Sequence, residues 1–156
     1  IEAAPINPAE ILIMEGKYAS KPPLPAKLGI EGVGTITAVG DGVQGFAVGD
    51  RVMSMGRANW AQEIQVPAST LIKVSTEADL LQIGMLKVNP ATAKFMLDHY
   101  VDLKPGDWVV QNAGNSAVGR YLIQLAKSKG VHSINIVRRE GLEKELTNYR
   151  CRLGVG

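Results

Sequence analysis

Hydrophobic and polar positions change their spacing along the chain, and the change separates two kinds of structure. Up to about Ser75, short apolar runs alternate with glycine and proline, which is typical of strands joined by tight turns. One short helix is predicted at 8–14, and strands are predicted within 32–40, 48–52, 60–66 and 71–74. Short strands separated by such turns favour a partly open β-barrel.

From about Thr76 onward, apolar residues recur at helical spacing. Helices are predicted at 76–88 and 91–100, with a break at Asn89-Pro90 because proline disfavours the α conformation in the residue before it. A short apolar strand at 108–110, a helix at 117–129 and a strand at 134–137 follow. We interpret the strand at 108–110 as buried on both faces. This segment of about 35 residues has the size of one βαβ unit.

The turn before the helix at 117–129 carries the candidate chemistry. In dinucleotide folds the first glycine of this turn lets the chain turn sharply, the second admits the pyrophosphate and the third packs helix on strand. Gly114 and Gly119 take the first and third places, and Ser116 stands at the second. Its hydroxyl can donate to a phosphate at the helix N-terminus. The alternative is a structural glycine-rich turn in a cofactor-free α/β domain.

Two arginines end the second strand of this unit, where an NAD-binding strand usually carries an acid that holds the ribose hydroxyls. Two guanidinium groups suit a 2′-phosphate, so Arg138 and Arg139 favour NADPH over NADH. A solvated basic strand end is the alternative. Glu140 opposes the NADPH interpretation, because its carboxylate would repel the 2′-phosphate unless it turns away or pairs with an arginine.

Composition narrows the classes of protein. The chain has 156 residues, 46% of them hydrophobic, which is enough for a globular core. A net charge of +2, dispersed along the chain, favours neither nucleic acid nor an anionic membrane as partner. No apolar run reaches the roughly 18 residues of a membrane helix. The single cysteine, Cys151, excludes an internal disulfide and is compatible with a reducing compartment, so we expect a cytoplasmic protein.

Several motifs, taken together, resemble a known family. Those shared with the medium-chain dehydrogenase/reductase superfamily are GIEGVG at 29–34, VGDRV at 48–52 and LKPGDWV at 103–109. That superfamily joins a GroES-like catalytic domain to a Rossmann domain. Within it, the chain most resembles the zinc-free trans-2-enoyl-thioester (enoyl-CoA or enoyl-ACP) reductases, through INPAE at 6–10, EGKY at 15–18, VNPATA at 88–93 and QNAGNSAVG at 111–119.

The resemblance implies a mixed α/β and β fold class, in which a GroES-like partly open β-barrel is joined to the start of a doubly wound parallel Rossmann sheet. We expect a GroES-like catalytic domain at 1–75 without its first strand, a helical connector at 76–100 and the first part of the NADP-binding domain at 101–156. Family members are about twice as long, so the chain would cover about their N-terminal half. Such a piece would expose a sheet edge and an apolar face, and we expect it to be inactive alone.

The chemistry implied is hydride transfer without zinc. Catalytic zinc needs about three protein ligands, usually Cys or His, and the chain has one Cys and two His. The metal-binding histidine of the superfamily would fall at Ile30, so we expect no metal. In the family, NADPH supplies a hydride to Cβ of the enoyl thioester. A proton reaches Cα, and negative charge develops on the thioester oxygen.

The resemblance also implies roles for individual residues, each assigned where a residue of this sequence matches a functional position of the family. Tyr18 matches the catalytic tyrosine of the family, a proton or hydrogen-bond donor to the substrate; composition alone makes it a partly buried packing residue. Asn89 matches a cofactor-contacting asparagine, with helix termination as its alternative role. Trp60 matches a tryptophan near the active-site cleft, and we expect it to pack first and line the cleft second.

The remaining transfers concern the cofactor. The phosphate-binding turn of the family is matched by Asn115, Ser116, Ala117 and Val118. Arg138 and Arg139 begin its 2′-phosphate segment, and Glu140 stands where the family often has a second arginine. This departure weakens the expected preference for NADPH but leaves the expected fold unchanged.

Two other functions stay open, a zinc-free quinone oxidoreductase and a nucleotide-binding module without catalysis. The family resemblance implies enoyl-CoA or enoyl-acyl-carrier-protein as substrate and a homodimer in the full-length protein, with neither nucleic acid nor membrane as partner. It also makes the mitochondrial matrix the alternative location.

Overall fold

The chain folds into two compact units, Ile1–Lys87 and Val88–Gly156, and each is described by itself. The structure is a computed structural model that describes residues 1–142, 145–146 and 152–155. The helices predicted as a connector are divided between the units, with α2 (Leu80–Gly84) in the first and α3 (Asn89–Asp98) in the second. None of the described helices is long and apolar enough to cross a membrane.

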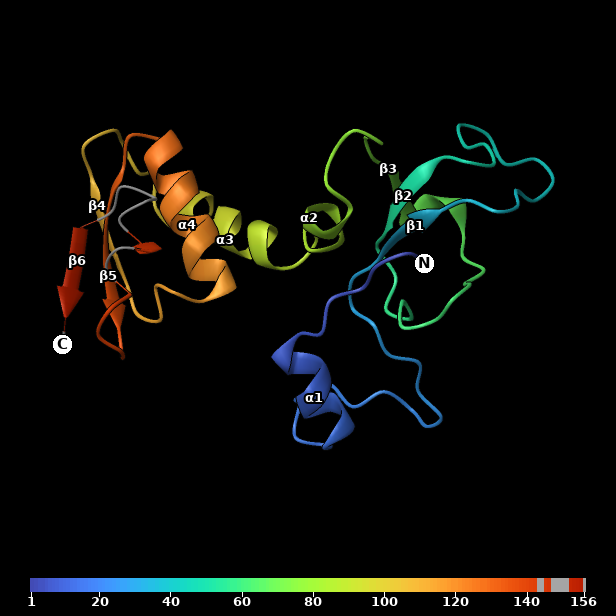
Figure 1. Ribbon diagram of the computed structural model, residues 1–156, viewed down its shortest axis with the longest axis horizontal. Coiled ribbons are helices and arrows are strands. Elements are labelled where there is room, and N and C mark those ends of the chain that lie inside the picture. The colour runs from blue at the N-terminus through green and yellow to red at the C-terminus, as the bar shows by residue number, and fades with distance from the viewer. Residues whose placement is uncertain (143–144, 147–151, 156) are drawn as a thin grey trace. The chain divides into compact units, whose positions relative to one another are not determined.

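An antiparallel sheet of three short strands forms the centre of the first unit, in the order β1-β2-β3 (Figure 1). The strands are β1 (Val33–Thr35), β2 (Arg51–Ser54) and β3 (Leu71–Lys73). A 3-10 helix, η1 (Ala68–Thr70), leads into β3. The buried side chains of this unit gather around Val33, Met53 and Ile83. This arrangement confirms three of the four predicted strands.

Helix α1 (Pro8–Met14) confirms the predicted short helix. Proline suits its first position, because the N–H group that proline lacks has no partner inside the helix there. The predicted strand at 60–66 is wrong, since no described strand includes these residues. Instead, the backbone N–H of Trp60 donates to Leu28 O at 3.0 Å, in a loop contact.

Helix α2 is shorter than the predicted helix at 76–88. It begins after Asp79, whose side chain accepts a hydrogen bond from Gln82 N at 2.9 Å and so caps the helix. The helix ends at Gly84, whose missing side chain leaves room for Val33 Cγ1; a Cβ there would approach that atom to 3.3 Å.

The second unit contains the predicted βαβ arrangement. Strands β4 (Trp108–Gln111) and β5 (His132–Val137) are parallel, and α4 (Ala117–Ser128) connects them. A further parallel strand, β6 (Arg152–Val155), pairs with β5 and was not predicted. Helix α3 begins at Asn89 with Pro90 in its first turn, so the predicted break at this dipeptide is instead a helix start.

Helices α3 and α4 pack against each other and cover one face of the parallel sheet (Figure 1). Their buried contacts come from Ala93, Leu97, Leu122, Ala126 and Val131. A second cluster joins Ile123 of α4 to Val137 of β5 and to Leu146. The middle of α4 is thereby fixed against the sheet.

The opposite face of the parallel sheet is apolar and uncovered by any described helix. Trp108 is 45% exposed and Val110 is 64% exposed, whereas Val109 packs against the helices. The Trp108 ring stacks on His132 at a centroid distance of 4.6 Å. The prediction that this strand is buried on both faces is therefore wrong for the described residues, because helices cover one side only.

An acid-sensitive ion cluster joins the ends of α3 and α4. Asp98 Oδ1 lies 2.6 Å from Lys129 Nζ, and Asp98 Oδ2 lies 2.5 Å from Lys94 Nζ. The hydrogen bond from Lys129, followed by that from Lys94, lowers the pKa of Asp98 below its ordinary value of 3.8. The stabilisation is therefore fully present above about pH 4 and disappears as the pH falls through the lower folded-state pKa.

We expect Asp98→Asn to lower the free energy of unfolding of the second unit at pH 7, and this deficit to disappear as the pH falls through the lowered folded-state pKa of Asp98. Denaturant unfolding at several pH values, followed by Trp108 fluorescence, measures the effect. Asp102→Asn is the matched control, because Asp102 is 85% exposed in its pair with Lys104. An equal Asp98→Asn deficit at every pH would contradict the assignment.

Candidate functional site

Tyr18 follows directly on the turn that ends α1. Gly16 adopts a φ of +68°, and its N–H donates to Ile13 O at 3.0 Å, while Lys17 N–H donates to Leu12 O at 2.8 Å. These two bonds form a Schellman motif. Tyr18 N–H also donates to Leu12 O, at 3.1 Å. The backbone of Tyr18 is therefore tied to the helix end, and its side chain is 36% exposed and open to a ligand.

A buried carboxylate anchors the start of the same helix. Glu10 is fully buried; its Oε2 accepts from Asn7 N at 2.7 Å and its Oε1 from Ile30 N at 2.6 Å. Asn7 Nδ2 donates to Glu31 Oε2 at 3.0 Å, and Glu31 is also fully buried. Buried charges are costly unless hydrogen-bonded. These bonds therefore fix α1, and Tyr18 behind it, against the segment at 29–31.

Lys87 holds the same segment from its other side. Its ammonium donates to the backbone carbonyls of Ile30 at 2.6 Å, Gly56 at 2.8 Å and Met55 at 2.9 Å. Burial, and then the nearby charge of Arg57, lower the pKa of Lys87. The described residues contain no group of three or more His, Cys, Asp or Glu side chains that could hold a metal ion.

Trp60 borders a hollow of about 340 Å³ in the first unit. The indole Nε1 donates to Pro5 O at 3.2 Å, which fixes the ring beside the start of α1. Among the described lining residues are Ala3, Ile6 and Asn59, and Tyr18 is not one of them. Trp60 thus packs and lines a hollow, but the hollow does not include the candidate tyrosine.

The glycine-rich turn of the second unit makes its reversal at Ala113. This residue has a φ of +50°, in the left-handed region that alanine rarely adopts, and no prediction pointed to it. Gly114 was predicted to make the sharp turn. Its role is instead close packing, because a Cβ on Gly114 would lie 2.8 Å from Asn135 Cβ. Strain at a residue of this kind is common at functional sites.

Gly119 brings the start of α4 against the turn. A Cβ on Gly119 would lie 2.6 Å from Gly114 O and 2.8 Å from Ala113 O, so only glycine fits. The predicted packing role is confirmed, although the contact is to the backbone of the turn. The turn residues Asn115 to Val118 follow one another around the N-terminus of α4, where Ala117 and Val118 occupy the first two helical positions.

Ser116 caps α4, because its Oγ accepts from Gly119 N at 3.1 Å. The hydroxyl hydrogen stays available, since a serine hydroxyl donates as well as accepts. The N–H groups of Ala117 and Val118 have no partner within the helix by its geometry. Serine and helix together thus present several donors on one side, which suits a phosphate.

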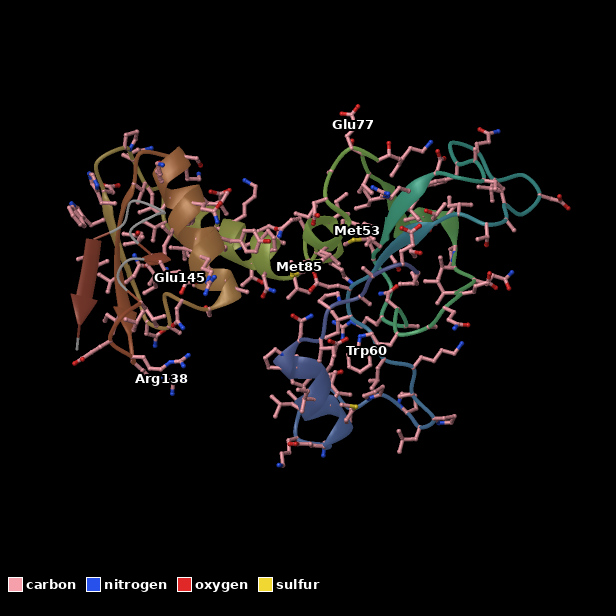
Figure 2. All side chains as sticks on the ribbon, in the orientation of Figure 1. Met53, Trp60, Glu77, Met85, Arg138 and Glu145 are labelled. Carbon is pink, nitrogen blue, oxygen red and sulfur yellow. The ribbon has the colours of Figure 1, made fainter. Side chains whose placement is uncertain are left out.

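Arg120 supports the turn and was not predicted. Its Nε donates to Asn115 O at 3.1 Å, and its Nη2 lies 2.6 Å from Glu145 Oε1. Glu145 is labelled in Figure 2 near the helix. A lone arginine after the glycine carries no recognisable pattern, so the sequence offered no signal for this contact.

Arg138 and Arg139 leave β5 at the same sheet edge as the turn. Gly114 N donates to Ile136 O at 3.2 Å, which places the turn beside the last residues of β5. Both arginines are exposed, and Arg138 extends away from the strand (Figure 2). Glu140 is exposed too, and none of the described ion pairs joins it to either arginine. The structure therefore brings the turn and the arginines together.

Asn89 is the first residue of α3, so it belongs to the second unit, and it is half-buried. Tyr18 belongs to the first unit. Of the predicted residues, those of the turn and the two arginines thus form one local group. Tyr18, which follows α1, and Asn89, which begins α3, lie on other elements.

Comparison with known proteins finds relatives of the chain as a whole. Residues 1–76 match the family described as the alcohol dehydrogenase GroES-like domain. The mitochondrial enoyl-[acyl-carrier-protein] reductase of Rattus norvegicus is 42% identical over 98% of the chain, which covers 42% of that protein. The Homo sapiens protein of the same name is 44% identical over 98% of the chain, which covers 42% of it.

Solved structures show the same similarity. A mutant enoyl thioester reductase from Candida tropicalis superposes with a TM-score of 0.88 at 29% identity, over 97% of this chain and 50% of that one. A structure named as an Etr1p/NADP/crotonyl-CoA complex gives 0.83 at 29% identity, over 97% and 49%. The chain spans about half the length of these relatives. The predicted fold class, a GroES-like domain followed by the start of a Rossmann sheet, is confirmed.

We expect Gly119→Ala to destabilise the second unit and to open the turn, although alanine favours a helix by about 1 kcal/mol over glycine. The added Cβ would meet two backbone carbonyl oxygens that cannot move without displacing the turn. Thermal unfolding followed by circular dichroism measures the change. Gly40→Ala is the control, because a Cβ at position 40 would have no neighbouring atom within 4 Å and the φ of Gly40 lies outside the left-handed region. Equal stability of the two variants would contradict the steric explanation.

Proposed function

We propose that the chain belongs to the enoyl thioester reductase family of the medium-chain dehydrogenase/reductase superfamily, as its similarity to these proteins indicates, and that the protein reduces trans-2-enoyl thioesters with NADPH. The observation that carries this proposal is the turn at 113–119. It is closed by glycine contacts and ends in the N-terminus of α4, beside two exposed arginines at the same sheet edge.

The residues of the second unit fit NADPH. In this proposal the pyrophosphate accepts hydrogen bonds from Ala117 N, Val118 N and the Ser116 hydroxyl, with Asn115 lining the turn. The close contacts of Gly114 with Asn135 and of Gly119 with the turn fix the backbone that carries these donors. Arg138 and Arg139 hold the 2′-phosphate as charge-assisted donors. A dinucleotide at the carboxyl edge of parallel strands follows the general rule for such sheets.

The first unit supplies the acid. NADPH, when bound, provides the hydride, and Tyr18 donates a hydrogen bond or a proton to the substrate as charge develops on the thioester oxygen. The exposed phenol and the rigid turn behind it support this role. Asn89 is proposed to contact the cofactor from the start of α3.

The names of relatives supply the remaining parts of the proposal. Structures of Etr1p are named as complexes with NADP and crotonyl-CoA, which supports an enoyl-CoA or enoyl-acyl-carrier-protein substrate here. A further structure is named as an Etr1p/Etr2p heterodimer, which supports a dimer without deciding between like and unlike subunits. The curated relatives are named as mitochondrial, which supports the mitochondrial matrix over the cytoplasm.

We expect Tyr18→Phe in the full-length protein to slow NADPH oxidation on crotonyl-CoA by about 100- to 10,000-fold, the usual contribution of a general acid. The affinity for NADPH should stay unchanged, because the phenol acts on the substrate. Absorbance assays and fluorescence titration measure the two quantities. An unchanged rate on crotonyl-CoA would instead favour a zinc-free quinone oxidoreductase, and a wild-type protein that binds NADPH but shows no turnover would favour a nucleotide-binding module.

We expect the double variant Arg138→Ala/Arg139→Ala to weaken NADPH binding by about 10- to 100-fold, because hydrogen bonds to charged groups contribute about 1.5–3 kcal/mol. Binding of NADH, which lacks the 2′-phosphate, should change little. Fluorescence titration with both cofactors measures the ratio. Lys127→Ala, in the last turn of α4, is the control for loss of positive charge. A parallel loss of both cofactors would contradict the 2′-phosphate assignment.

A further inference from the structure

A chain of buried and half-buried amide and hydroxyl groups lies under the glycine-rich turn. It joins Gln111, the last residue of β4, to Asn135 and Ser133 of β5. Asn135 is fully buried and Ser133 is buried, although strands covered by helices usually present apolar side chains there. The register pairs Gln111 with Asn135, so the two side chains stand next to each other on the covered face of the sheet.

The amide groups of Gln111 and Asn135 both donate to partners. Gln111 Nε2 donates to Gly119 O at 3.0 Å and also to Asn135 Oδ1. Asn135 Nδ2 donates in turn to Ser133 Oγ at 3.1 Å. A buried polar group is costly when unpaired, but a fully satisfied network is rigid and specifies one arrangement. The amide of Gln111 thus links three elements, namely β4, β5 and the first turn of α4.

Asn135 also forms the floor on which the turn rests. Its Cβ would lie 2.8 Å from a Cβ added to Gly114, so the backbone of the turn packs directly on this side chain. On the same strand, Asn135 lies three residues before Arg138. A shift of Asn135 would therefore move the turn relative to the end of β5.

We propose that Gln111 and Asn135 are positioning residues, which hold the glycine-rich turn and the N-terminus of α4 at the height where the pyrophosphate of NADPH binds. The inference rests on the proposed function, because it assigns the turn to that cofactor. Gln111 fixes the start of the helix through Gly119, and Asn135 fixes the turn through Gly114. Neither side chain touches the cofactor.

The test compares two ligands that share only one part of the site. NADPH carries both the pyrophosphate and the 2′-phosphate, whereas adenosine 2′-monophosphate carries the 2′-phosphate alone. Gln111→Met keeps the length of the side chain and removes both N–H donors. We expect it to weaken NADPH binding about tenfold or more. The reason is that the N–H donors of the turn and of the start of α4 would no longer be held in place at the charged pyrophosphate. Binding of adenosine 2′-monophosphate, by nuclear magnetic resonance titration, should change less than about twofold.

Gln124→Met is the matched control. Gln124 lies on the exposed side of α4, and its side chain donates to Arg120 O within that helix. It should leave the affinities for both ligands unchanged. Equal NADPH affinity in wild type and Gln111→Met would overturn the positioning role and leave the proposed function intact. An equal loss for both ligands would overturn it too, since it indicates general loss of structure. A folded wild type without NADPH affinity would overturn the proposed function, and this inference with it.

Asn135→Asp provides a second test, which can still be carried out if Gln111→Met fails to fold. The carboxyl group keeps the acceptor for Gln111, and burial raises the pKa of such a group. When protonated it can also donate to Ser133, as the amide does. We expect the ratio of its NADPH affinity to that of wild type to approach one at low pH. The ratio should fall as the pH rises, because the carboxyl group then ionises beneath the turn. A pH profile parallel to that of wild type would overturn the role of Asn135.

Discussion

The close approach of Gly119 to the carbonyl oxygens of Ala113 and Gly114 is the constraint on which the second unit depends. Any side chain at position 119 would separate α4 from the turn, and the helix N-terminus would then no longer face the sheet edge. The left-handed Ala113 and the cap formed by Ser116 follow from the same geometry, because the chain must reverse within a few residues. The N–H groups at the start of α4, which have no partner within the helix, suit an anionic ligand.

In the first unit, charged groups hold the segment that supports α1. Two buried glutamates and the ammonium of Lys87 converge on the segment around Ile30, where each oxygen of Glu10 accepts one backbone N–H. This segment holds the start of α1, and the Schellman turn at the other end of α1 presents Tyr18. The chain therefore uses a network of fixed hydrogen bonds, in place of a large apolar core, to hold the candidate acid.

Local signals in the sequence were sufficient for much of this fold. Pro8 marked the start of α1, and the apolar spacing around Leu122 marked α4 within one residue of its end. The strand predicted at 60–66 failed because alternation of apolar residues cannot reveal whether a partner strand exists. The two-sided burial of β4 failed for a related reason, since layers depend on the whole tertiary arrangement. In the site, Ser116 and the arginines were recognisable, whereas Ala113, Arg120 and Gln111 act through contacts that only the folded chain creates. Asn135 does give a signal in the sequence, because it is a polar residue within an apolar strand.

Lys87 directs its three N–H donors at backbone carbonyls, so a reagent must displace these hydrogen bonds to reach its nitrogen while the first unit stays folded. Amine-acylating reagents should therefore modify exposed lysines such as Lys21 and spare Lys87 until the segment around Ile30 comes apart. The acylation pattern of the chain thus reports, residue by residue, whether the scaffold behind the phenol is intact.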